Sequence, residues 1–252
     1  MDSKLSKFQY LLRLSDNCLV LSQQLAAWCG HGPALEEDLA LTNVALDLLG
    51  QARLWLTYAG EVEGLGRDED ALAYGRDGPD FRNLLLVEQP NGHYGNTVAR
   101  QFLFDAWHQH LLAGLCQSSD PRIAEIAQKA VKEVRYHVER SAGLMIALGD
   151  GTELSHDRMQ EAVNKLWPYT NEWFESDAVD VQCAAEGVAP AASSLSAPWR
   201  ASVEAVLNRA TLAMPAYTGH QRGGKQGMHS EHLGHLLTSL QFVQRTYPGA
   251  QW

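Results

Sequence analysis

Apolar residues recur at steps of three and four along most of the chain, which is the spacing of amphipathic helices. The pattern is clearest after Asp120-Pro121, where a capping residue and a proline at the first helical position open a run that ends near Gly149. The apolar positions of this run are Ile123, Ile126, Ala127, Ala130, Val131, Val134, Val138, Met145 and Leu148. We therefore predict a long helix with one buried face.

Three further long helices are expected before this one, at about 5–28, 35–61 and 95–116. Glycine, proline or serine residues separate the first from the second and the third from the fourth. A long irregular stretch at about 64–91 lies in the middle and can cross the end of a bundle. Four long helices with one crossover are the parts of a ferritin-like four-helix bundle.

Shorter helices are expected toward the C-terminus, at about 156–174, 197–212 and 230–246. A link rich in proline, alanine and serine lies at 187–198, and no pair of alternating strands is found. We predict an all-α fold: a single ferritin-like helical domain over residues 1–252. Its core bundle would span about 5–149 and its additional helices about 152–246.

The charge and hydropathy of the chain exclude some classes of partner. The net charge of −10 does not provide the positive field that a nucleic acid or an anionic membrane requires. The longest apolar runs are too short to cross a bilayer, and the first residues do not resemble a signal peptide. A soluble, cytoplasmic protein with neither nucleic acid nor membrane as a partner is expected.

Metal ligands can be sought at fixed places in such a bundle. Ferritin-like carboxylate proteins hold two metals with one Glu from each of two helices and a Glu-x-x-His pair from each of the other two. Here the predicted inward positions carry Asp47, Asp105 and His137. The first helix has Gln23 and Gln24 where a Glu would be needed.

This set of donors is incomplete. Gly50 follows Asp47 by three residues and Val134 precedes His137 by three, so neither forms a pair of ligands. Two irons need more oxygen and nitrogen donors than these positions supply. We predict that Asp47, Asp105 and His137 are vestigial, paired polar residues and that the chain itself holds no cofactor; one weakly bound metal ion is the alternative.

Two other patterns are less specific. His229, His232 and His235 share a helix face, which favours a polar contact surface over a transition-metal site. The segment from Gly219 to Lys225 matches the phosphate-binding pattern Gly-x-x-x-x-Gly-Lys. However, the required Ser or Thr is missing and no strand precedes it, so we interpret it as a loop, with anion binding as the alternative.

Several longer segments of the sequence resemble those of a known protein family. They are LSDNCLVLSQ at 14–23, DLAL at 38–41, LDLLGQAR at 46–53, NLLLVEQPNG at 83–92, AWH at 106–108, KEVRYH at 132–137, NKLW at 164–167 and EHLG at 231–234. Together they cover almost the whole chain, and the sequence resembles the C subunits of the ring-1,2-phenylacetyl-CoA epoxidase family.

The resemblance implies a bacterial multicomponent monooxygenase of aerobic phenylacetate breakdown. In this family the A subunit holds the di-iron centre and epoxidises the CoA-activated ring, and a reductase component with NADPH, flavin and iron–sulfur groups supplies electrons. The C subunit is its ferritin-like, non-catalytic relative. This chain would then stabilise the catalytic subunit and other oxygenase components, as a homodimer or hetero-oligomer.

The resemblance also suggests contact with acyl-CoA. The expected positions are Asp80, Phe81, Arg82 and Asn83, with a second patch at Val181, Gln182 and Cys183. Arg82 could meet a CoA phosphate and Phe81 could cover an adenine or pantetheine face; alternatively, Phe81 pins the crossover to the bundle. Two other functions remain open: a metal-binding oxidase and a free-standing acyl-CoA binding module.

Overall fold

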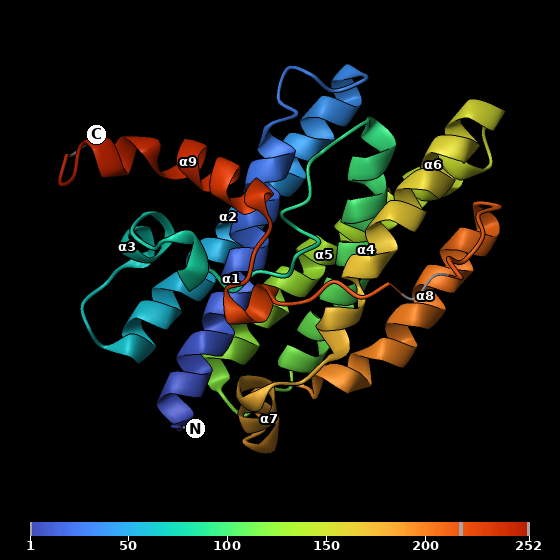
Figure 1. Ribbon diagram of the computed structural model, residues 1–252. Helices are drawn as coiled ribbons and strands as arrows, with labels where there is room; N and C mark the ends of the chain where they lie inside the picture. Colours follow the sequence, from blue (N-terminus) through green and yellow to red (C-terminus); the bar gives the residue numbers. More distant parts are fainter. Residues whose placement is uncertain (1, 217–218, 251–252) are drawn as a thin grey trace. The chain divides into compact units, whose positions relative to one another are not determined.

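Helices make up the regular structure of this chain, and no strand occurs in the residues that the computed structural model describes, 2–216 and 219–250. The predicted all-α class is confirmed and is consistent with a ferritin-like bundle. The α-helices in chain order (Figure 1) are α1 Ser3–Ala26, α2 Leu35–Glu63, α3 Glu69–Tyr74, α4 Tyr94–Leu115, α5 Pro121–Gly149, α6 Glu153–Leu166, α7 Ala178–Ala185, α8 Ser196–Arg209 and α9 Glu231–Thr246.

The chain divides into two compact units. Unit 1 consists of Met1–Pro90 with Arg222–Trp252, and unit 2 of Asn91–Gln221. The C-terminal helix α9 therefore belongs with the N-terminal helices, and it contacts α1 and α3. The single domain over residues 1–252 stays a prediction.

Unit 1 is built on the paired helices α1 and α2. The turn between them is held by Asp38, whose Oδ2 accepts the backbone N–H of Gly30 at 2.8 Å and of Gly32 at 3.0 Å. At its other end α2 stops at Gly64, where φ is +72° and the N–H bonds to the Gly60 carbonyl. Such a left-handed residue is the usual end of a helix.

The crossover between α2 and the end of unit 1 was expected to be irregular. It contains α3 and a 3₁₀ turn over Gly78–Asp80. Asp68 caps α3 by accepting the N–H of Ala71 at 2.8 Å. A helix of six residues is too short to show a period of 3.6, which explains why the sequence pattern missed it.

Unit 2 is built on α4 and α5, with α6 and α8 also contacting α4. Every residue of α4 from Gly95 to His108 is buried, including the polar side chains of Arg100, Gln101 and Asp105. The predicted start of α5 is confirmed. Asp120 accepts the N–H of Arg122 at 3.0 Å and of Ile123 at 3.3 Å, and Pro121 occupies the first turn.

Unit 2 differs from the prediction at one helix end and by one additional helix. The helix expected over 156–174 ends at Leu166 and continues as 3₁₀ turns to Phe174, because Pro168 has no N–H to extend the ladder. The helix α7 was missed. Asp177 caps it by accepting the N–H groups of Val179 and Asp180, and its two turns give little periodic signal.

Candidate functional site

Asp105 of α4 lies fully buried at the centre of a polar cluster in unit 2. Gln101 Nε2 donates to its Oδ1 at 2.6 Å, and the Ser141 hydroxyl of α5 donates to its Oδ2 at 2.9 Å. Burial raises the pKa of Asp105 to about 6, although the charge of His137 and the two hydrogen bonds act in the opposite direction. Burial lowers the pKa of His108 to about 3, and the charge of His137 adds to this effect. His108 is therefore a neutral imidazole at neutral pH.

The cluster does not fit a pair of irons. A di-iron site needs carboxylates from several helices, whereas here both oxygens of the single carboxylate of Asp105 accept hydrogen bonds from uncharged side chains. Within residues 2–216 and 219–250, no group of three or more His, Cys, Asp and Glu is arranged to hold a metal ion. Asp105 and His137 are both buried, and their role as remnants of a ligand set stays a prediction.

The prediction that Asp47 of α2 points inward is wrong. Asp47 is half-buried, and Asn43 and Gly50, which lie one turn away on the same side of the helix, are exposed. Leucines occur on two sides of this helix, so the apolar periodicity did not define a single buried face, and Asp47 lies between the two rows. Gln51 is the inward polar residue, and Cys18 Sγ donates to its Oε1 at 3.8 Å. The buried stripe consists of Leu41, Val44, Ala45, Leu48, Gln51, Ala52, Trp55, Leu56, Ala59 and Gly60.

A second buried network in unit 1 holds the crossover against α1. Arg76 donates to both carboxylate oxygens of Asp16, at 3.0 Å and 2.5 Å, and the backbone N–H of Arg82 donates to Asp16 Oδ2 at 2.8 Å. Asp16 and Arg76 are both buried, so removal of either would leave an uncompensated charge in the interior. The sequence analysis did not predict this pair. The signal that could have revealed it is Asp16, a single acidic residue inside an otherwise apolar stretch of α1.

Phe81 is completely buried, with the Arg76 guanidinium carbon 4.3 Å from the centre of its ring. The ring is therefore not exposed to an adenine or pantetheine face in this structure, and the predicted contact of Phe81 with acyl-CoA stays a prediction. The alternative, that Phe81 pins the crossover to the bundle, agrees with this packing.

The neighbours of Phe81 are also engaged with the protein. The guanidinium of Arg82 donates to the carbonyl oxygens of Pro79 at 2.6 Å and of Phe81 at 2.8 Å, and burial lowers its pKa. Asn83 is buried and donates to the Leu84 carbonyl. Of the four predicted acyl-CoA contacts in this segment, only Asp80 has an exposed side chain.

Glu88, at the end of the crossover, forms a third buried network with the C-terminal segment of unit 1. Its Oε2 lies 2.8 Å from His229 Nδ1 and accepts Asn83 Nδ2 at 3.0 Å, and its Oε1 accepts the backbone N–H of Ser230 at 2.6 Å. The other ring nitrogen of His229 lies 3.0 Å from the Phe81 carbonyl. Burial lowers the pKa of His229, but these hydrogen bonds and the Glu88 charge outweigh it, so the pKa is raised. Because both ring nitrogens face acceptors, the protonated imidazolium satisfies both.

The histidine face predicted at the start of α9 is thus only partly formed. His229 is engaged with Glu88, His232 is half-buried and His235 is exposed. The glycine-rich loop before α9 packs against the crossover: a Cβ added to Gly224 would collide with the carbonyl of Asn83. Glycine at this place is explained by close packing within unit 1.

The second predicted acyl-CoA patch lies on α7 of unit 2. Val181 is exposed, Gln182 is half-buried and donates to Glu186 Oε1 at 2.7 Å, and Cys183 is buried in the core. Only Val181 and Gln182 are accessible to a ligand.

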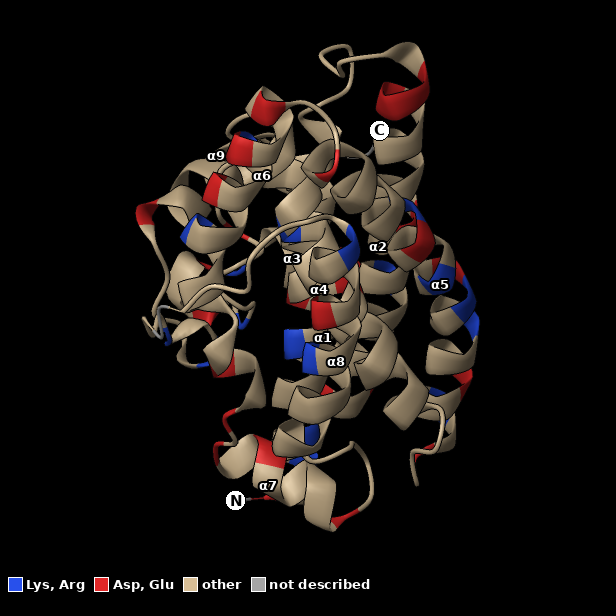
Figure 2. Cartoon of the chain, turned by 90° about the vertical axis from the view of Figure 1, so that its right-hand side faces the viewer, with Lys and Arg blue, Asp and Glu red and all other residues tan. Residues whose placement is uncertain are grey.

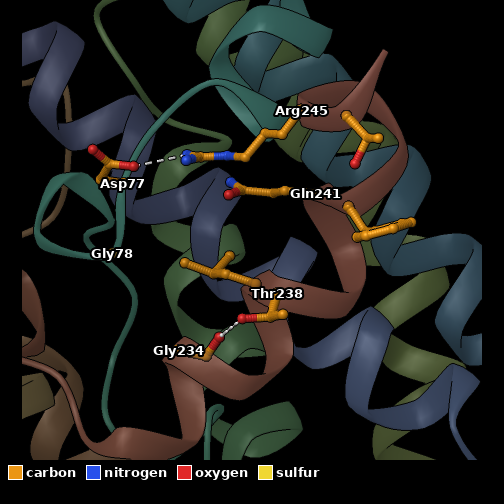
Figure 3. A pocket seen from close by; sticks show the side chains of 9 residues that line it. Asp77, Gly78, Gly234, Thr238, Gln241 and Arg245 are labelled. Carbon is orange, nitrogen blue, oxygen red and sulfur yellow. Dashed lines mark hydrogen bonds and ion pairs between the residues drawn. The ribbon is translucent and has the colours of Figure 1, made fainter. Parts of the chain in front are cut away.

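A cavity of about 350 Å³ lies in unit 1, where α9 meets the crossover. Figure 3 shows Gln241 and Arg245 extending from α9 toward Asp77 and Gly78. Gln241 Nε2 donates to the carbonyls of Ala73 and Arg76 at 3.1 Å and 3.0 Å, and Arg245 donates to Asp77 Oδ1 at 2.9 Å. These hydrogen bonds hold α9 against the crossover. The polar residues that line the cavity are therefore already engaged in stabilising the packing of unit 1.

The helices and the inner polar residues define the class of this molecule: an all-α protein, consistent with a ferritin-like bundle, whose described inner residues do not form a di-iron ligand set. A sequence model of the phenylacetic acid catabolic protein family matches residues 2–252, and the chain belongs to this family.

Among curated proteins, the chain is similar to the C subunit of the 1,2-phenylacetyl-CoA epoxidase of Escherichia coli strain K12. The two are 53% identical over 243 residues, which cover 96% of this chain and 98% of the relative. The resemblance inferred from the sequence segments is confirmed. Separately, none of the described helices combines the length and apolar character needed to span a bilayer.

Proposed function

We propose that this chain is the structural, non-catalytic subunit of a multicomponent oxygenase that epoxidises phenylacetyl-CoA, and that it binds and stabilises the catalytic subunit. Phenylacetate catabolism is the process of its family, and its relative is named as a subunit of the epoxidase. The di-iron centre would belong to the catalytic subunit, and the NADPH, flavin and iron–sulfur groups to the reductase component.

The observation that supports a non-catalytic role is the hydrogen bonding around Asp105. In a metal site the carboxylate oxygens point at the ion, but here Gln101 and Ser141 occupy both oxygens. The neighbouring His108 is neutral and buried. This cluster is suited to hold α4 and α5 together rather than to activate oxygen.

Co-expression tests the proposal. The catalytic subunit is produced with and without this chain, and soluble yield and iron content are measured for each separated subunit. We expect yield and iron in the catalytic subunit to fall when this chain is absent, with iron confined to the catalytic subunit. Unchanged yield, or stoichiometric iron in this chain, would refute the proposal in favour of independence or of a metal-binding oxidase.

Asp105→Asn is the matched variant. Asn can accept the hydrogen bond of Gln101 and donate one to Ser141, so the packing is retained while the ligating charge is lost. The proposal expects the reconstituted oxygenase to keep its turnover and iron. Loss of iron without loss of folding would assign Asp105 to a metal site.

Contact with acyl-CoA remains a proposal for the accessible residues Asp80, Arg82, Val181 and Gln182. Calorimetric titration of the isolated chain with CoA measures it directly. Tight binding that is lost in Arg82→Ala and retained in Gln182→Ala would place the contact at the crossover. Tight binding by the chain alone would favour an acyl-CoA module over a structural role.

A further inference from the structure

Asn91 and Gly92 form the single Asn-Gly pair of the sequence and stand just before α4 at the start of unit 2. The backbone nitrogen of a glycine can attack the side-chain amide of a preceding asparagine, because glycine has no side chain to block the approach. Asn91 is half-buried and Gly92 is exposed, so water has access to the pair. The groups around the pair decide whether this reaction is favoured.

The backbone nitrogen of Gly92 is available as a nucleophile. In the described part of the chain no group accepts its N–H, so the nitrogen gives up no hydrogen bond when it reacts. The φ angle of Gly92 is +57°, in the left-handed region that favours glycine. A Cβ at this position would collide with Asn96 Nδ2, so the packing also requires a residue without a side chain.

The side-chain oxygen of Asn91 faces hydrogen-bond donors. Arg100 Nη2 donates to Oδ1 at 2.7 Å, and the hydroxyl of Thr97, which donates to the Asn91 carbonyl at 3.1 Å, lies 3.4 Å from the same Oδ1. Arg100 is 1% exposed, so little water screens its charge. Burial lowers the pKa of Arg100 to about 9, which leaves the guanidinium charged at neutral pH. Donors placed on a carbonyl oxygen stabilise the oxyanion that forms when the carbonyl carbon is attacked.

We propose that Asn91 is a self-deamidation site in which Gly92 supplies the nucleophile and Arg100 stabilises the oxyanion. The product is an aspartate at position 91. The inference is carried by residues of unit 2 alone and does not rest on the proposed function.

The reaction needs no reagent other than water. The Gly92 nitrogen attacks Cγ of Asn91, gives its proton to water and expels Nδ2 as ammonia, which leaves a cyclic imide. Water then adds to a carbonyl carbon of the imide, the bond from that carbon to the nitrogen breaks, and the nitrogen takes back a proton. The net reaction consumes water and converts the amide into a carboxylate and an ammonium ion.

The carbon that water attacks decides the product. Opening at Cγ gives an ordinary aspartate, whereas opening at the main-chain carbon gives isoaspartate and lengthens the backbone. In an unfolded chain both carbons are open to water. In the folded chain Arg100 lies on the oxygen of Cγ, so it activates this carbon. The fold therefore directs the reaction to aspartate.

A carboxylate at position 91 also suits its surroundings. It would face the buried guanidinium of Arg100, and a hydrogen bond between two charged groups is stronger than the present one to a neutral amide. The first turn of α4 contains no acidic residue, and His93 at the N-cap provides no side-chain cap. The start of a helix favours negative charge. We therefore expect the conversion to stabilise the start of α4.

Peptide mapping by mass spectrometry tests the site. The full chain is incubated folded at neutral pH and, in parallel, unfolded in guanidinium chloride, and the mass gain of an amide-to-acid exchange is followed at position 91. An isoaspartyl methyltransferase labels isoaspartate but not aspartate. We expect the folded chain to yield aspartate with little isoaspartate and the unfolded chain to yield both. Asn43 is the internal control, since it is exposed but is followed by valine, and it should keep its amide.

Two variants test the donors. Arg100→Gln should slow the conversion of the folded chain at least about tenfold, because the charge on the oxyanion is lost. Thr97→Val should slow it less, since the hydroxyl is the more distant donor. Circular dichroism verifies that both variants stay folded, and the comparison of folded with unfolded wild type needs neither of them. Asn91→Asp mimics the product and should unfold at a higher temperature than the freshly purified wild type.

A folded chain that keeps its amide while the unfolded chain converts fully would overturn the proposal. Isoaspartate as the main product of the folded chain would overturn it as well, because the opening would then not be directed by Arg100. The same holds for a rate that neither Arg100→Gln nor Thr97→Val lowers. A lower unfolding temperature for Asn91→Asp would contradict the pairing of the product with Arg100.

Discussion

The helices α2 and α5 have the same length, 29 residues, but differ in what they present to solvent. The outer face of α5 is charged, with Arg122 paired to Glu125 and a row of Lys, Arg and Glu beyond it (Figure 2). The outer face of α2 is a row of leucines between an acidic first turn and Arg53. α5 therefore has one charged side that faces water and one apolar side that is buried. α2 instead has two apolar sides, and only one of them is covered within its unit.

The same difference explains the error at Asp47. A helix with one apolar face reveals its buried side by periodicity, and α5 was correctly assigned for this reason. A helix with two apolar faces offers two equally good settings. The stripe that includes Asp47 lies between the two apolar rows of α2, beside the row of Leu48 and Gln51 that the core uses.

The largest expected loss of stability comes from a substitution on the buried face of α2, and a matched substitution on the exposed face is its control. Leu48→Ala removes a completely buried side chain and should lower the free energy of unfolding by about 2–5 kcal/mol. Leu46→Ala, two residues earlier on the exposed face, should cost less than about 0.5 kcal/mol at concentrations where the chain is monomeric. Urea denaturation of the two variants measures the difference. Equal losses would contradict the assignment of Leu48 to the core face and Leu46 to the outer face.

His229→Ala should produce the next largest effect, because it leaves the buried carboxylate of Glu88 without its cation. We expect a loss of about 3 kcal/mol at pH 6. The folded-state pKa of His229 is raised, so its stabilisation is fully present below the unfolded value of about 6.5 and is lost as the pH rises through the raised value. Stability of the wild type and variant should therefore converge at alkaline pH. A pH-independent difference would assign the effect to packing.

Asp105→Asn should be stabilising near pH 7. The folded-state pKa of Asp105 is raised to about 6, so its contribution is favourable below the unfolded pKa and is lost as the pH rises through 6. Replacement by Asn should raise the free energy of unfolding by up to about 3 kcal/mol at pH 7, and the gain should disappear below about pH 4. Chemical denaturation across this range measures it. A destabilised variant at pH 7 would show that the charged form is favoured.

The smallest effects concern the helix starts. Asp120 caps α5 with hydrogen bonds to two backbone N–H groups, and Asp120→Ala should cost about 1 kcal/mol. At the start of α2 the same position is Ala34, which provides no side-chain cap, so Ala34→Asp should gain about 0.5–1 kcal/mol. Thermal unfolding compares the two. A loss of stability for Ala34→Asp would show that a carboxylate at this position does not cap α2.

The sequence located the long helices because each carries more than three turns of periodic apolar residues. It also located the start of α5, since Asp120 and Pro121 act locally. It did not reveal α3 and α7, which are too short for a period to emerge. For the candidate site it identified Asp105 and His137 as buried, but it left open whether Phe81 meets a ligand or pins the crossover, and the packing of Phe81 under Arg76 agrees with the second reading.

By itself the sequence determined the helical class and the family, because periodicity and long matching segments are properties of the chain. Only the tertiary structure decided which polar groups meet. Asp16 with Arg76, and Glu88 with His229, are separated by 60 and 141 residues, and each pair forms where folding excludes water. A buried charge requires a partner, but the identity of that partner depends on positions in space that the order of residues does not encode locally.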